Sequence, residues 1–148
     1  MDTLAEDAAA LNEHLELGPC HFAILMHIML GDLTLSAPSR AAIRDEWRGY
    51  MLTLPTSIGD AAYQVIHRQS IAKELTETTV PVLAIAGAQD HAYPPPLSSV
   101  RLAAAAPTGR NVTVAGAGHS VALEDPDAVA GHLRRHFAAA SQRRCLLR

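Results

Sequence analysis

The chain lacks the sequence features that identify disulfide-rich, nucleic-acid-binding and membrane-spanning proteins. Its 148 residues include only two cysteines, Cys20 and Cys145, and two thiols cannot form the disulfide framework of a small secreted domain. The net charge of −3 is mild, and no basic patch is interleaved with aromatic side chains, so the sequence gives no sign of a nucleic-acid partner. The longest apolar run, residues 22–30, is too short to span a bilayer.

The amino terminus also lacks the basic start of a secretory signal peptide, because it reads Met-Asp-Thr-Leu-Ala-Glu-Asp. We therefore expect a cytoplasmic protein without a membrane partner, with both thiols free in a reducing compartment. What the chain does have is a globular composition, with 49% apolar and 18% charged residues. A chain of this length is expected to form one domain with a hydrophobic core.

The first half of the chain predicts helices around one apolar strand. Residues 3–17 have apolar side chains at steps of three or four, which is typical of an amphipathic helix. The apolar run at residues 20–30 suits a buried strand, or a strand and part of a second one. Residues 37–75 have helical character interrupted by Pro55 and Gly59, which predicts two or three helices without a strand.

The second half alternates between strand and helix. Residues 80–86 are rich in Val, Leu and Ile, as a strand buried on both faces should be. A helix is expected at 97–106, a short strand at 111–115, and a last helix at 127–140 with Pro126 in its first turn. This order predicts an α/β fold, with a short parallel sheet of about three to four strands flanked by helices.

Polar residues stand where the two strands of the second half end. Asp90 follows the first of these strands, and His119 follows the next in a loop that contains Gly116 and Gly118. The carboxyl ends of parallel strands meet at one edge of a sheet, and a carboxylate beside an imidazole gives the support that a general base needs. The spacing alone leaves a purely structural role for both residues open.

Two segments resemble a known family. The segment TVPVLAIAGAQD, residues 79–90, ends in Asp90, and the segment NVTVAGAGH, residues 111–119, ends in His119. They resemble the strands and loops that carry the acid and the histidine of the catalytic triad in the α/β-hydrolase family, and LEDP, residues 123–126, resembles the family's path into its last helix. The acid also precedes the histidine, as in the family. The resemblance implies that Asp90 and His119 occupy the triad acid and base positions.

The amino-terminal half resembles the family too, but it departs at the nucleophile. Residues 4–17 and the following GPCHF resemble the helix and strand that lead to the family's nucleophile elbow, and residues 37–75 resemble its helical cap. The elbow needs Gly-x-Ser-x-Gly, whose glycines permit a strained turn. This chain reads ILMHI, which places Met26 at the nucleophile and Ile24 and Ile28 at the glycines. Methionine cannot act as this nucleophile, so the chain has no recognisable one.

No other residue replaces the nucleophile convincingly. In an alternative alignment, residues 20–26 form the elbow strand and residues 27–33 the next strand, with the elbow deleted. The apolar neighbours of His27 indicate a core or strand-end histidine, and Ser120 should point away from the adjacent His119. The family's first strands, which complete the oxyanion hole, are also missing.

The remaining histidines show no metal-ligand spacing, and we expect neither a metal ion nor a cofactor. His132 and His136 are four residues apart on an expected helix, but they lack the intervening Glu of a zinc protease motif. These two histidines are better explained as residues on a solvent-exposed helix face than as metal ligands. The other histidines considered for a metal site are His14, His67 and His91.

The resemblance implies a single α/β-hydrolase-like domain over residues 1–148, by ancestry a small-molecule hydrolase of esterase or lactonase type. The missing elbow favours a second hypothesis, a catalytically inactive remnant or a binding module, and a third is a truncated or internally deleted enzyme. We predict that Asp90 lies within hydrogen-bond reach of His119, and that no Ser, Cys or Asp reaches the other ring nitrogen. We also predict self-association through an open strand edge at residues 20–26.

Overall fold

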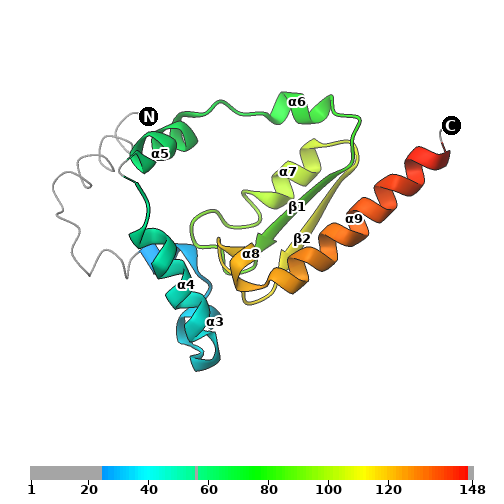
Figure 1. Ribbon diagram of the computed structural model, residues 1–148. Helices are drawn as coiled ribbons and strands as arrows, with labels where there is room; N and C mark the ends of the chain where they lie inside the picture. The colour runs from blue at the N-terminus through cyan, green and yellow to red at the C-terminus, as the bar shows by residue number, and fades with distance from the viewer. Residues whose placement is uncertain (1–24, 56, 147–148) are drawn as a thin grey trace.

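The computed structural model describes residues 25–55 and 57–146 (Figure 1). The predicted helix at residues 3–17 lies outside this range. The elements are, in chain order, α3 (Asp32–Ser36), the 3-10 turn η1 (Pro38–Arg40), α4 (Ala41–Leu52), α5 (Ile58–His67), α6 (Ala72–Thr76), β1 (Val82–Gly87), α7 (Ser99–Ala105), β2 (Gly109–Val114), α8 (Val121–Glu124) and α9 (Pro126–Leu146).

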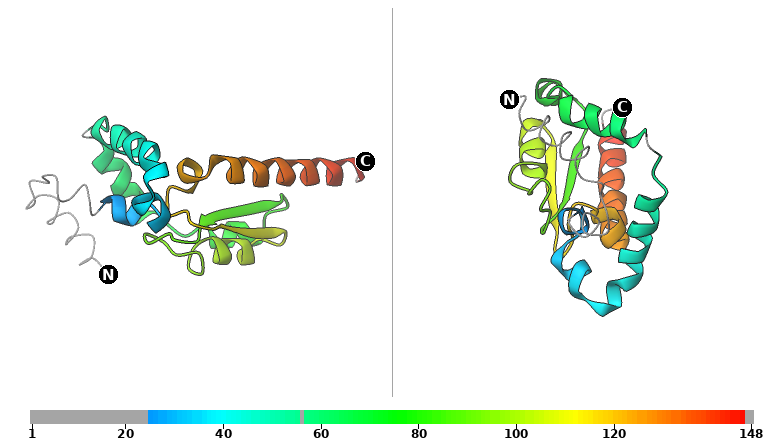
Figure 2. Two further views of the ribbon diagram at one scale, coloured as in Figure 1. Left: turned by 90° about the horizontal axis from the view of Figure 1, so that it is seen from below. Right: turned by 90° about the vertical axis from the view of Figure 1, so that its left-hand side faces the viewer.

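β1 and β2 form a parallel sheet between two helical layers. The register pairs Val82 with Gly109 at one end and Gly87 with Val114 at the other. Figure 2 shows α7 on one face of the sheet and the long α9 on the opposite face. Because both faces are covered, β1 has no alternating polar pattern, and Ala84 and Ala86 are buried. The predicted α/β class, the parallel pair and the two strands of the second half are confirmed.

The apolar run before α3 is helical and not a strand, which corrects the prediction for residues 20–30 over its described part. Residues 25–29 are helical, and the Leu30 N–H donates to the Met26 carbonyl oxygen at 2.9 Å. The alternative second strand at residues 27–33 is likewise absent. A short apolar run suits a buried helix as well as a strand, and Met26 and Leu30, four residues apart, share one helical face.

That face packs against Trp47 of α4 and forms the core cluster at this end of the molecule. Met26, Leu30 and Trp47 are 8%, 0% and 3% exposed. The described part of this run, residues 25–30, adds no strand, and the sheet of the described residues has two strands where three to four were predicted. Leu123 of α8, the helix that follows the carboxyl end of β2 (Figure 1), packs against this cluster.

The helical character predicted for residues 37–75 is confirmed by α4, α5 and α6. Figure 1 shows the chain passing through α5 and α6 in a wide arc that stands off from the sheet before it enters β1. The final helix also agrees with the prediction, and Pro126 is its first residue. None of the helices in the described segments combines the length and the apolar character needed to cross a membrane.

Candidate active site

The loops that follow β1 and β2 are fastened to each other by backbone hydrogen bonds. The Ala88 N–H donates to the Val114 oxygen and the Gln89 N–H donates to the Ala117 oxygen, both at 2.8 Å. These bonds extend the parallel ladder past the ends of the strands. They bring the loop that holds Asp90 alongside the loop that holds His119.

The two side chains form a hydrogen-bonded pair at this edge of the sheet. His119 Nδ1 lies 2.9 Å from Asp90 Oδ2. The other carboxylate oxygen, Oδ1, accepts the N–H of Tyr93 at 2.8 Å, so both oxygens of Asp90 are engaged. Asp90 is 7% exposed, whereas the His119 side chain is 43% exposed. The predicted proximity of the two residues is confirmed.

This geometry selects one tautomer of the neutral ring. A carboxylate only accepts hydrogen bonds, so the hydrogen belongs on Nδ1 and the lone pair on Nε2. Within residues 25–55 and 57–146, no hydrogen bond reaches Nε2. An outward lone pair on an exposed, oriented imidazole can take up a proton from a nucleophile or from water.

Within the described residues, no hydroxyl, thiol or carboxylate group is hydrogen-bonded to that nitrogen. Met26 is buried in the core cluster with Leu30 and Trp47, and Ile28 is on the same short helical segment. His27 is exposed on that segment, so the prediction of a core or strand-end histidine is wrong. Its apolar neighbours suggested burial, but His27 lies outside the buried face that Met26 and Leu30 share.

Ser120 makes backbone hydrogen bonds on both sides of its peptide units. Its backbone N–H donates to the Met29 oxygen at 2.9 Å, and its own carbonyl oxygen accepts the N–H groups of Leu123 and Glu124 in α8. The residue therefore fixes the loop after His119 through its backbone.

A second imidazole–carboxylate pair lies at the same edge of the sheet. His91 Nε2 is 3.1 Å from Asp32 Oδ1, and the two side chains are 46% and 62% exposed. Solvent screens such a pair, so it adds little stability. The sequence analysis missed it because 59 positions separate the partners and no local spacing relates them. No group of three or more His, Cys, Asp or Glu side chains in the described segments could hold a metal ion.

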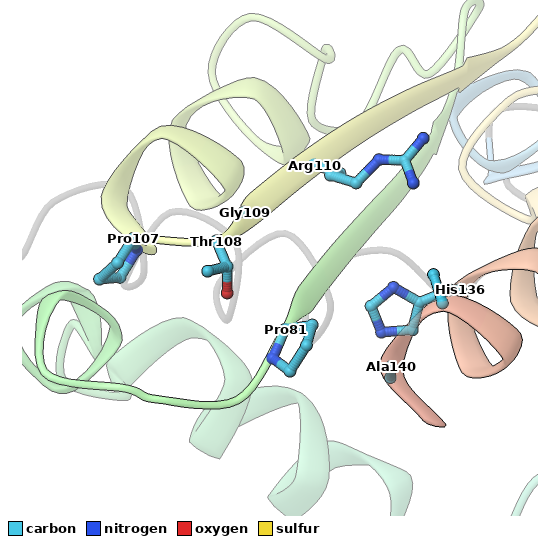
Figure 3. Close-up of a pocket in the computed structure, with 8 residues that line it drawn as sticks. Pro81, Pro107, Thr108, Gly109, Arg110, His136 and Ala140 are labelled. Carbon is cyan, nitrogen blue, oxygen red and sulfur yellow. The ribbon is translucent and has the colours of Figure 1, made fainter. Parts of the chain in front are cut away.

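A separate hollow of about 300 Å³ lies at the opposite end of the sheet (Figure 3). It opens where β1 and β2 begin and where α9 passes over them, so the length of the strands separates it from Asp90 and His119. Its lining residues are Pro81, Pro107, Thr108, Gly109, Arg110, His136, Ala139 and Ala140. It is not part of the Asp90–His119 site.

Neither a family model nor a curated protein matches this sequence. The fold does match two solved structures from Mycobacterium tuberculosis, Rv0554 and a candidate non-heme bromoperoxidase named BpoC. Each aligns with a TM-score of 0.74 and 23% identity over 92% of this chain. The chain spans about half the length of these structures, 50% and 51%. It therefore has a partial α/β-hydrolase fold.

Proposed function

We propose that Asp90 and His119 are the acid and the base of a hydrolase site of the α/β-hydrolase type. The hydrogen bond of 2.9 Å between Asp90 Oδ2 and His119 Nδ1 carries this proposal. In a catalytic triad the acid holds the imidazole in the correct tautomer and stabilises its charged form, while the imidazole moves the proton of the nucleophile. A buried carboxylate and an exposed ring suit these two roles.

The substrate class follows from the sequence resemblance and not from a pocket. The resemblance indicates a small ester or lactone, and helices α4, α5 and α6 would form the cap that shapes its binding site. This activity needs no cofactor, nucleic acid or membrane, and a cytoplasmic location suits it. The likeness to the two solved structures supports the fold on which such a site would be built.

The chain by itself should not turn over an ester, because the sequence has no recognisable nucleophile elbow and no nucleophile is bonded to His119 among the described residues. We expect hydrolysis of an activated ester such as 4-nitrophenyl acetate to equal that of the His119→Ala variant. Hydrolysis by the unmodified chain that His119→Ala abolishes would contradict the claim that the nucleophile is missing.

The proposed roles can be tested by supplying the missing part of the site. Co-expression with a polypeptide that provides a Gly-x-Ser-x-Gly elbow and its preceding strands should produce ester hydrolysis. His119→Ala removes the base and Asp90→Asn removes its orienting acid. Each variant should lower that hydrolysis by about a thousandfold or more. His91→Ala is the matched control and should keep the activity. Hydrolysis that survives His119→Ala would overturn the proposal.

A second candidate function is that of an inactive remnant or binding module. The burial of Met26 in the core cluster favours it, because the position aligned with the nucleophile is used for packing. A complex that forms in the co-expression experiment but hydrolyses no ester would support this second function.

A further inference from the structure

Glu124 is a buried acid that the Asp90–His119 pair does not contain. It ends the short helix α8, five residues after His119, and it is only 2% exposed. Burying a carboxylate costs free energy unless hydrogen bonds replace its water. The partners of this carboxylate therefore indicate why an acid stands at this position.

Both oxygens of Glu124 accept backbone N–H groups from two different loops. Oε1 accepts the N–H of Gly118 at 2.7 Å, and Oε2 accepts the N–H of Gly31 at 2.8 Å. Hydrogen bonds to a carboxylate are stronger than those between neutral groups. One side chain thus joins the histidine loop to the turn before α3.

The two loops touch backbone to backbone where Glu124 joins them. A side chain at Gly118 would collide with the backbone of Leu30 and Gly31, so only glycine allows this approach. The main chain of Glu124 is itself fixed, because Arg40 Nη1 donates to its carbonyl oxygen at 2.7 Å. The carboxylate therefore acts from an anchored position.

His119 stands between two residues whose N–H groups are held. The Gly118 N–H is bonded to Glu124, and the Ser120 N–H is bonded to the Met29 oxygen at 2.9 Å. Fixing the backbone on both sides limits where the His119 ring can point. The restrained backbone therefore keeps the ring within hydrogen-bonding distance of the Asp90 carboxylate.

We propose that Glu124 is a positioning residue for the base, which holds the histidine loop so that His119 Nδ1 stays bonded to Asp90. This inference deepens the proposed function and rests on it for its catalytic meaning. Its test measures the ring and not hydrolysis, so a failure here leaves the roles of Asp90 and His119 standing. A failed reconstitution of ester hydrolysis would leave the positioning result standing in the same way.

The test compares Glu124→Gln with Asp125→Asn in the full chain by ¹⁵N NMR. An amide at position 124 keeps one accepting oxygen and presents an NH₂ group to the other backbone N–H, so one of the two bonds is lost. We expect the ratio of the Nδ1–H to the Nε2–H tautomer of His119 to fall by about threefold to tenfold, the effect of weakening one hydrogen bond. The Gly31 or Gly118 amide should also lose protection from exchange.

Asp125→Asn is the matched control, because Asp125 Oδ1 accepts the Ala128 N–H at 3.0 Å at the start of α9 and does not touch the histidine loop. It should leave the tautomer ratio unchanged. If circular dichroism shows that Glu124→Gln is unfolded, Glu124→Asp, which is too short to reach both loops, takes its place with the same expectation. A ratio equal to that of the unmodified chain, or an equal change in Asp125→Asn, would overturn the proposal.

Discussion

Asp90 and His119 differ in solvent exposure, and this difference suits their proposed roles. Asp90 is buried and bonded through both oxygens, so its carboxylate is held in place to orient a ring. His119 keeps one nitrogen open on an exposed side chain. A base must reach its substrate, whereas an orienting acid need not.

Trp47 has the largest buried side chain of the core cluster. It is 3% exposed on α4 and packs against Met26 and Leu30. We expect Trp47→Ala to lower the free energy of unfolding by about 3–5 kcal/mol, because it removes a large buried side chain and leaves a cavity. Urea denaturation followed by circular dichroism measures the change.

Tyr50→Ala provides the comparison on the same helix. Tyr50 is 56% exposed, and its hydroxyl donates to Glu46 at 2.9 Å on the surface. Its replacement should change the free energy of unfolding by no more than about 0.5 kcal/mol. Equal losses in the two variants would show that the cluster around Trp47 does not support the fold.

At the scale of elements, the sequence predicts best where several local signals agree. The strand ending before Asp90 combines β-branched residues with a following turn, and the last helix begins at Pro126 with apolar residues behind it. The strand lies within two residues of its predicted bounds, and the helix begins one residue before its predicted start and ends six residues after its predicted end. The Asp90–His119 pair was predictable for the same reason, since parallel strands bring their following loops together.

The sequence predicts secondary structure least well where hydrophobicity is the only signal. The run that contains Met26 and Leu30 has no alternation to separate a strand from a buried helix, and its packing on Trp47 decides the outcome. Glu124 and the His91–Asp32 pair were missed for another reason. Their contacts join loops that lie far apart in the sequence, and only the folded chain brings them together.

At the scale of the whole molecule, the described part leaves apolar surface and strand edges uncovered. Each of the two strands has a partner on one side only, and Leu133 and Phe137 of α9 are 38% and 63% exposed. The open edge was predicted at residues 20–26, most of which lie outside the described residues, and within the described part the unpaired edges belong to β1 and β2. We propose that copies of the chain pair through one of these edges.

Sedimentation velocity should therefore show a sedimentation coefficient that rises with protein concentration. Phe137→Glu serves as the comparison, because it removes an exposed apolar side chain from α9 and leaves both strand edges intact. Association through a strand edge should persist in this variant, whereas loss of association would assign the contact to α9. A monomer at all concentrations would contradict self-association.

The central claim is that Asp90 holds His119 as a base with its lone pair outward, and the tautomer of His119 tests it most directly. At a pH where the ring is neutral, ¹⁵N NMR should place the hydrogen on Nδ1. Asp90→Asn should reverse this preference, because its amide can donate to Nδ1, while the signals of His91 should stay unchanged as an internal control. A hydrogen on Nε2 in the unmodified chain, or a tautomer indifferent to Asp90→Asn, would contradict the account.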